Sequence, residues 1–153
     1  MLIVNDVDEE VQKLTAALTA ATMDIRVTTD TTNDYNTAIR SMVANLYDVY
    51  IVAQYLADTP LTGDDIVRRA NAGGCFRPII ITTSQSDDAL VEEICEDCGA
   101  AGFLNTNKDM GSRIVKRAIQ YAIGHYQCLQ DVKAQLIRVQ KELVDVKRKL
   151  DRG

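Results

Sequence analysis

The chain has 153 residues, of which 46% are hydrophobic and 25% are charged, so it can form one folded domain with an appendage. No apolar run approaches the roughly 20 residues of a membrane-spanning helix, and no export signal opens the chain, which predicts a cytoplasmic protein without a membrane span. The net charge of -5 divides into +3 for residues 130–153 and -8 for residues 1–129, and so acidic a body argues against nucleic-acid binding.

Short apolar runs alternate with amphipathic segments along residues 1–105. The continuous, β-branched runs Val49–Val52 and Ile79–Ile81 are typical of strands that are buried on both faces of a parallel sheet. Strands are predicted at Leu2–Val4, Ile25–Thr28, Val49–Val52, Ile79–Thr82 and Gly102–Leu104. Helices are predicted at about Glu9–Ala21, Asn33–Asn45, Asp64–Ala72 and Asp87–Asp97. This alternation predicts an α/β fold, a (βα)5 doubly wound parallel sheet of five strands.

Functional groups in such a sheet gather on the loops that follow the carboxyl ends of the strands. These loops are predicted at residues 5–8, 30–33, 53–63, 83–87 and 105–108. We therefore expect any site to be built from these five segments.

The last segment is predicted to be one long helix, or two nearly continuous ones, over residues 109–151, because no proline interrupts it. At about 1.5 Å per residue, such a helix is about 60 Å long and exceeds a small domain. The predicted division is a body over residues 1–125 and an extension of the last helix over residues 126–153.

The extension carries apolar residues at heptad spacing. The a positions are Leu129, Leu136, Leu143 and Leu150, and the d positions are Val132, Val139 and Val146. This pattern predicts a coiled coil, by default a homodimer, although leucine at a with a β-branched residue at d leaves a higher oligomer open. Ile137 and Val144 widen the stripe, which leaves room for an additional partner. Glu142 and Lys147 would attract each other in a parallel pair. The alternative is a helix that packs back on its own domain.

The four cysteines are Cys75, Cys95, Cys98 and Cys128, and the second and third form a CxxC pair. A structural zinc site needs about four ligands, but no second CxxC exists. The single histidine, His125, lies on the predicted last helix, at a d position if the heptads are extended backward. We therefore expect half-buried cysteines, no metal site and no cofactor.

Four motifs in order resemble the landmarks of response-regulator receiver domains, over residues 1 to about 125. They are Leu2–Asp6, Asp48–Ala53, Arg77–Thr83 and Gly99–Leu104. The resemblance implies a flavodoxin-like fold and a role in bacterial two-component signalling. It also implies a carboxylate acceptor at the end of the third strand, Mg²⁺-holding acids after the first, a hydroxyl after the fourth and a lysine after the fifth.

This chain departs from that pattern at most of its chemical positions. The acceptor position is Ala53, the lysine position is Thr106, and the acidic pair is reduced to Asn5 and Asp6. Thr83 retains the hydroxyl. The departures imply a degenerate receiver, or pseudo-receiver, that is not an enzyme and binds Mg²⁺ weakly if at all, with Asp6 as a vestigial metal candidate.

Other interpretations remain open at this stage. Asp58 is an alternative acceptor in the loop after Ala53, with Lys108 replacing the missing lysine. A flavodoxin-like cofactor protein is disfavoured, because the loop Asn5–Glu9 is anionic and would repel a phosphate. Thr83 and Phe103 match the switch positions of receivers, or else they are an ordinary strand-end hydroxyl and a core aromatic.

The segment Arg117–Ile123 resembles the last helix of receivers that continue through a coiled coil into an output domain. The expected function is therefore a phosphorylation-independent protein-interaction and dimerisation module. Its expected partners are a second copy and a signalling protein or a missing output domain. One alternative is that the chain is the N-terminal part of a longer signalling protein.

Overall fold

The computed structural model describes residues 1–20, 28–57, 59–84 and 88–152. The described residues form a five-stranded parallel sheet in the order β2-β1-β3-β4-β5. The strands are β1 (Leu2–Val4), β2 (Asp30–Thr32), β3 (Tyr50–Ala53), β4 (Ile79–Thr83) and β5 (Gly102–Asn105). The expected doubly wound α/β fold is confirmed, and β3 lies at the centre of the sheet.

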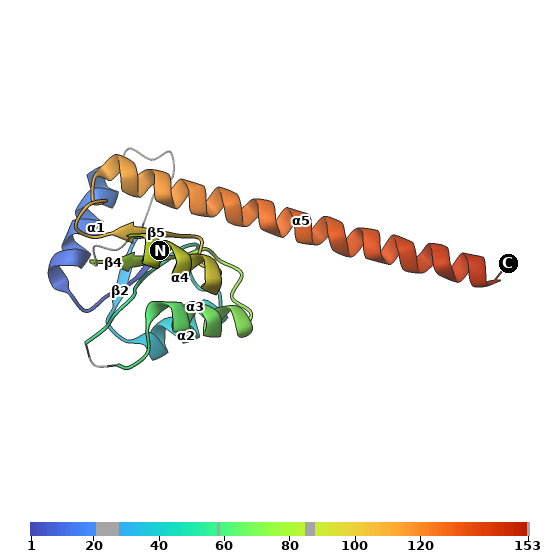
Figure 1. Ribbon diagram of the computed structural model, residues 1–153, viewed down its shortest axis with the longest axis horizontal. Coiled ribbons are helices and arrows are strands. Elements are labelled where there is room, and N and C mark those ends of the chain that lie inside the picture. Colours follow the sequence, from blue (N-terminus) through green and yellow to red (C-terminus); the bar gives the residue numbers. More distant parts are fainter. Residues whose placement is uncertain (21–27, 58, 85–87, 153) are drawn as a thin grey trace.

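Helices cover both faces of the sheet (Figure 1). The helices α1 (Asp8–Ala20) and α5 (Ser112–Arg152) lie on one face, and α2 (Tyr35–Val43), α3 (Gly63–Ala72) and α4 (Asp88–Cys98) lie on the other. Alternate residues of one strand point to opposite faces. In β4, Ile79 and Ile81 therefore join the core cluster under α2, α3 and α4, whereas Ile80 joins the cluster under α1 and α5.

The second strand differs from the prediction. Thr28 lies outside any strand, and the remaining residues of the predicted strand, 25–27, lie outside the described residues. The observed strand is Asp30–Thr32, within the segment expected to be a loop, and it pairs with β1 in the register Leu2↔Asp30 and Val4↔Thr32. The prediction was wrong because β2 is a polar, largely exposed edge strand, which no apolar run marks.

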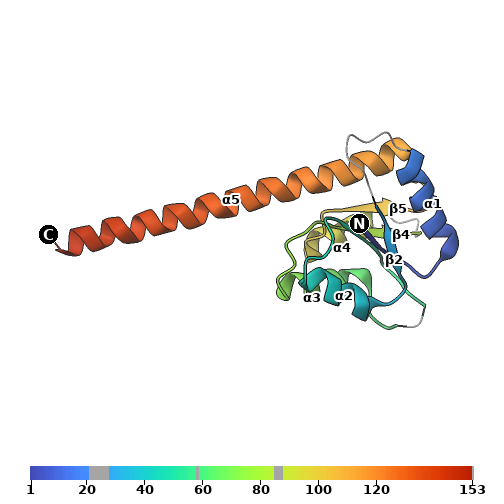
Figure 2. The same cartoon turned by 180° about the vertical axis from the view of Figure 1, so that it is seen from behind.

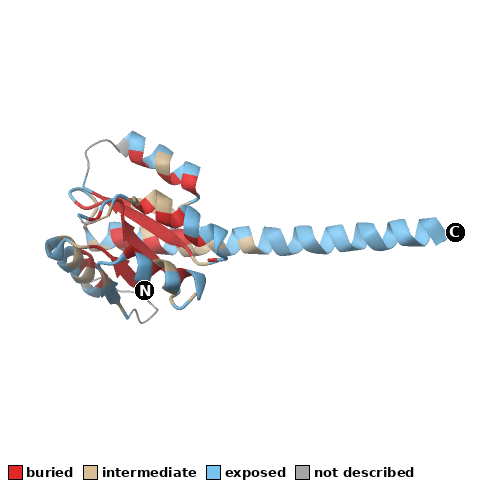
Figure 3. Ribbon diagram, turned by 90° about the horizontal axis from the view of Figure 1, so that it is seen from below, coloured by how far each residue is buried: buried red, intermediate tan, exposed pale blue. Residues whose placement is uncertain are grey.

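The last helix extends far beyond the body (Figure 2). It has 41 residues, about 60 Å at 1.5 Å per residue, and buries Val115, Ile119 and Ala122 near its start. Residues 131–152 are exposed throughout (Figure 3). None of the helices in the described part of the chain is both long and apolar enough to cross a membrane.

Candidate functional site

The carboxyl end of the central strand holds a methyl group. Ala53 is the last residue of β3 and is 5% exposed. Its carbonyl oxygen accepts a 2.6 Å hydrogen bond from the hydroxyl of Tyr35, which stands at the start of α2. Burial, followed by the charge of nearby Asp6, raises the pKa of the Tyr35 phenol, which therefore remains a neutral donor.

The end of β1 is joined to the end of β5 through a side chain of α1. The Glu10 carboxylate accepts one hydrogen bond from Asn5 Nδ2 at 2.8 Å and another from Thr106 Oγ1 at 3.0 Å. The backbone N–H of Thr106 donates to the carbonyl of Thr83 at 2.8 Å. Three of the predicted site residues thus meet in one network, with Asn5 and Thr106 buried.

Glu10 is a site residue that the sequence reasoning missed. It lies in the first turn of α1, where acids favour a helix N-terminus, so its charge had an ordinary local explanation. The available signal was its position directly after the loop that leaves β1. Its two carboxylate oxygens accept hydrogen bonds from Asn5 and Thr106, which are far apart in the sequence of the body.

Asp6 stands apart from this network. Its Oδ2 accepts a 2.7 Å hydrogen bond from the backbone N–H of Ala57, so it holds the loop between β3 and α3. Over the described ranges, no group of three or more histidine, cysteine, aspartate or glutamate side chains is arranged to hold a metal ion. The structure therefore gives Asp6 a loop-holding contact.

The loop between β3 and α3 folds back on the end of β3. The side chain of Gln54 donates to Asp64 Oδ1 at 2.8 Å, and the backbone N–H of Asp64 donates back to Gln54 Oε1 at 3.2 Å. A Cβ on Gly63 would lie 2.9 Å from the carbonyl oxygen of Ala53, so only glycine fits this close approach. The alternative acceptor, Asp58, lies outside the described residues.

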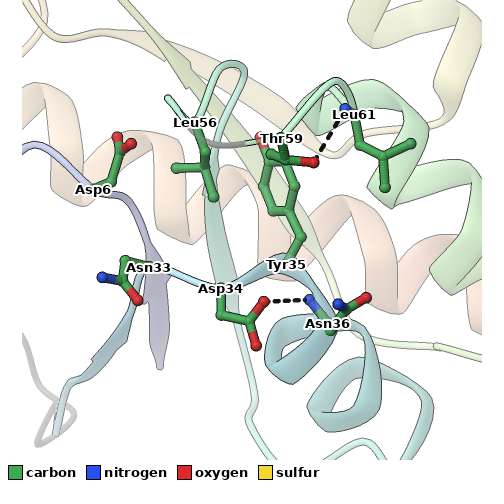
Figure 4. A pocket seen from close by; sticks show the side chains of 8 residues that line it. All are labelled: Asp6, Asn33, Asp34, Tyr35, Asn36, Leu56, Thr59 and Leu61. Atoms are coloured by element: carbon green, nitrogen blue, oxygen red, sulfur yellow. Dashed lines mark hydrogen bonds between the residues drawn. The ribbon is translucent and has the colours of Figure 1, made fainter.

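A pocket of about 250 Å³ opens beside this loop (Figure 4). It is lined by Asp6, Asn33, Asp34, Tyr35, Asn36, Leu56, Thr59 and Leu61. The Asp34 carboxylate caps α2 by accepting from the backbone N–H groups of Asn36 and Thr37. With two carboxylates in its lining, the pocket disfavours an anion such as phosphate.

Comparisons with solved structures agree on the architecture. The chain is similar to the receiver domain of a modulated diguanylate cyclase from Desulfovibrio desulfuricans G20, at 24% identity over 83% of this chain and 94% of that chain, with a TM-score of 0.64. The chain has the receiver fold. It is also similar to the receiver domain of an HD domain-containing protein from Pseudomonas fluorescens Pf-5, at 18% identity over 85% of this chain and 90% of that chain, with a TM-score of 0.67.

A third similar structure is a yeast Spc42 trimeric coiled-coil segment fused to another protein. The identity is 15% over 97% of this chain and 94% of that chain, and the TM-score is 0.69. No family model matches the sequence, and neither does any curated protein.

The two residues that were predicted to match receiver switch positions, Thr83 and Phe103, lie on neighbouring strands. Thr83 is the last residue of β4 and is buried, whereas Phe103 on β5 is half-buried and packs against the core under α2, α3 and α4. The strand register places Ile81 opposite Phe103 and Thr83 opposite Asn105. Phe103 therefore stands two residues before the end of β5 that carries the Glu10 network.

The cysteines carry no metal-site geometry in the described part of the chain. Cys75, Cys95 and Cys98 are buried free thiols, and Cys128 is exposed on α5. Burial raises the pKa of Cys95 to about 12, so this thiol stays protonated at neutral pH. The CxxC pair on α4 therefore packs in the core as two neutral thiols.

Proposed function

We propose that the chain is a pseudo-receiver, a signal-transduction module that acts by binding proteins and not by accepting a phosphoryl group at the end of β3. The observation that carries this proposal is Ala53 at the end of the central strand, with its carbonyl bound by Tyr35. A methyl group cannot attack phosphorus. The resemblance to receivers places the acceptor carboxylate at this position.

The network beside Ala53 supports the same function. A lysine would neutralise phosphate charge, but Thr106 stands in the corresponding position and donates to Glu10. A phosphoryl group entering there would meet the Glu10 carboxylate, and like charges repel. The Glu10 carboxylate thus serves as the acceptor for Asn5 and Thr106 in this network.

The module function rests on the projecting helix. The seven heptad residues, from Leu129 to Leu150, are between 44% and 75% exposed. Removing apolar surface from water is favourable by about 25 cal/mol per Å², so a partner that covers this stripe stabilises the assembly. A second copy supplies the same heptad pattern, which makes a homo-oligomer, by default a dimer, the partner that we propose. The remaining partner would be a signalling protein or an output domain that follows the helix.

The phosphorylation part of the proposal is tested by incubating the full chain with acetyl phosphate and Mg²⁺ and reading its intact mass. We expect no phosphoryl adduct, whereas a receiver that retains its acceptor aspartate, treated in parallel, gains one. The matched variant is Asp58→Asn. An adduct on the original chain that is lost in this variant would make Asp58 the acceptor and overturn the proposal.

A further inference from the structure

The last helix leaves the body at the end of the sheet where the strands begin. The helix α5 follows the carboxyl end of β5 and runs back across the sheet, so its free part emerges at the amino ends of the strands (Figure 1). Tyr126 and Gln130 are the last half-buried residues of α5. Burial raises the pKa of the Tyr126 phenol, and Cys75 and Arg77, in the turn before β4, lie near enough to act on it as well. This turn therefore lies beside the point where α5 becomes free.

The turns that precede β3 and β4 expose apolar side chains. Val43, at the end of α2, is 41% exposed, Leu46 is 68% exposed and Phe76 is 49% exposed. The side chain of Asn45 joins the two turns, because its Oδ1 accepts from the backbone N–H of Phe76 at 3.0 Å and its Nδ2 donates to the carbonyl of Gly74 at 3.4 Å. Val43, Leu46 and Phe76 form the base patch of the body.

The free part of α5 continues the face that is buried in the body. The buried residues of α5 are Val115, Ile119 and Ala122. At about 100° per residue, Ile137 and Val144 lie within roughly 35° of their mean direction, whereas the seven heptad residues point roughly 100° away from it. Ile137 is 53% exposed and Val144 is 50% exposed. Besides the heptad face, the extension therefore carries a second apolar face, the body-facing stripe of Ile137 and Val144.

The body-facing stripe and the base patch border one open corner. The stripe is part of a shallow hollow of about 470 Å³, lined by Ile137, Gln140, Lys141, Val144, Asp145 and Arg148. Packed helices have their axes about 8–10 Å apart, so a helix on this stripe would lie on the sheet side of α5, in line with the base patch. From Gln130 to Val144 the distance along the helix is about 21 Å, which is the length of about four helical turns.

Charges beside the stripe select an acidic partner. Four cations point to within roughly 70° of the direction of the stripe, namely Lys133, Lys141, Lys147 and Arg148. Asp151 is an acid on that side, whereas three other acids point roughly 90° or more away, namely Asp131, Glu142 and Asp145. A second copy docked on the stripe would bring the same cations with it, and like charges repel. An acidic partner is attracted instead.

We propose that the corner between the base patch and the body-facing stripe binds an acidic amphipathic helix of a signalling protein. This inference rests on the proposed role as a protein-interaction module and names the surface and the chemistry of the partner. The apolar side of the bound helix covers Ile137 and Val144, its acids lie beside Lys141 and Arg148, and one of its ends contacts Phe76. The heptad face stays open to a second copy.

Two synthetic helical peptides test the chemistry of the partner. Each is about four turns long and carries leucines every three or four residues on one side. Glutamates flank the leucines in one peptide, and lysines flank them in the other. We expect fluorescence anisotropy with the full chain to show about tenfold tighter binding of the glutamate peptide. Equal binding of the two peptides, or no binding of either, would overturn the inference.

Paired serine variants locate the peptide on the extension. The double variant Ile137→Ser with Val144→Ser should raise the dissociation constant of the glutamate peptide about tenfold, because it removes the apolar contacts of the stripe. The matched control, Val139→Ser with Val146→Ser, makes the same change at the same spacing on the heptad face and should leave the constant unchanged. Weaker binding in the control alone would place the peptide on the heptad face and contradict the proposal.

A charge swap tests the flanking cations. The double variant Lys141→Glu with Arg148→Glu should invert the preference, so that the lysine peptide binds more tightly than the glutamate peptide. The matched control, Arg138→Glu with Lys149→Glu, reverses two cations that point away from the stripe and should keep the original preference. A preference that stays the same in both double variants would refute the role of these charges.

The contribution of the body is tested at the base patch. Phe76→Ser should raise the dissociation constant of the glutamate peptide about fivefold. Tyr55→Ser, at an exposed aromatic beyond the opposite end of the sheet, is the control and should change nothing. An unchanged constant in Phe76→Ser would confine the site to the extension and overturn the inference for the body.

Sedimentation separates this inference from the self-association on which it does not depend. The variant Ile137→Ser with Val144→Ser should keep the oligomeric state of the original chain, and its dissociation into monomers would make the stripe an interface between copies and overturn the inference. A monomeric original chain at all concentrations would overturn the proposed self-association, whereas the peptide measurements would still decide the acidic-helix site.

Discussion

Thr106 and Glu10 are 96 residues apart in sequence, and the hydroxyl of Thr106 donates a 3.0 Å hydrogen bond to the carboxylate of Glu10. The second oxygen of that carboxylate accepts from Asn5. One acid on α1 therefore ties the end of β1 to the end of β5. The resemblance to receivers would place a lysine at position 106, whereas Thr106 of this chain is a neutral donor that binds the Glu10 carboxylate.

The variant Glu10→Ala tests this closure. It leaves the side-chain amide of buried Asn5 without its Glu10 acceptor, whereas the hydroxyl of Thr106 keeps the carbonyl of Thr83 at 3.3 Å as a second acceptor. One unsatisfied buried group costs about 1–3 kcal/mol. We expect the free energy of unfolding to fall by about 1–3 kcal/mol, measured by denaturant titration. The matched control, Glu9→Ala, removes an exposed surface pair with Lys13 and should change stability by less than about 1 kcal/mol. Equal stability of the two variants would contradict a structural role for the network.

The variant Tyr35→Phe removes the donor to the Ala53 carbonyl. Loss of a buried hydrogen bond costs about 0.5–1.5 kcal/mol net, so we expect a loss of that size at neutral pH. Tyr55→Phe is the matched control, because Tyr55 is largely exposed. A calorimetric scan in which both variants match the original chain would show that the bond contributes nothing.

The raised pKa of Tyr35 predicts that the free energy of unfolding depends on pH in the alkaline range. Burial, and then the charge of Asp6, raises the pKa of Tyr35 in the folded chain above its ordinary value of 10.0. Its contribution is therefore complete below pH 10 and is lost as the pH rises above 10 towards the folded-state pKa. We expect the stability difference between the original chain and Tyr35→Phe to shrink over that range. A difference that stays constant to pH 11 would contradict the raised pKa.

Thr82 offers a stabilising substitution. Its hydroxyl oxygen is buried and has no hydrogen-bond partner among the residues that the structure describes, and the residue is 1% exposed. The variant Thr82→Val keeps the shape and removes the unsatisfied group, so we expect a gain of about 1 kcal/mol in the free energy of unfolding. Thr82→Ser keeps the hydroxyl, loses a methyl group and should be less stable. Thermal unfolding of the three proteins ranks them, and a valine variant below the original chain would refute the expectation.

The extension of the last helix, residues 126–153, is here called the tail. A substitution in the tail is predicted to change the assembly of copies without changing the stability of the body. Leu143→Asp places a charge in the middle of the heptad stripe, where buried unpaired charge is costly, so we expect the oligomer to dissociate at micromolar concentration. Residue 143 is exposed in the single chain, so thermal unfolding of the body should stay unchanged. Lys141→Asp, on the outer face of the tail, is the control that should leave the oligomer intact. Light scattering distinguishes the variants, and an intact oligomer in Leu143→Asp would contradict the coiled coil.

Most of the fold was predictable because its signals are local. The continuous β-branched runs predicted β3 and β4, because strands buried on both faces need apolar residues at every position. The edge strand β2 has one neighbour and exposed side chains, so its polar residues resembled a loop. The long last helix followed from the absence of proline and from the heptads.

By itself the sequence determined the parallel α/β sheet and the apolar stripe of the tail. It also determined that a methyl group, that of Ala53, stands at the end of the third predicted strand. Each of these features depends on residues that are close together in the chain. Only the tertiary structure decided that Glu10 reaches Thr106 and that Tyr35 binds the carbonyl of Ala53. Hydrogen bonds between distant segments depend on how helices pack against the sheet, and no local periodicity encodes that packing.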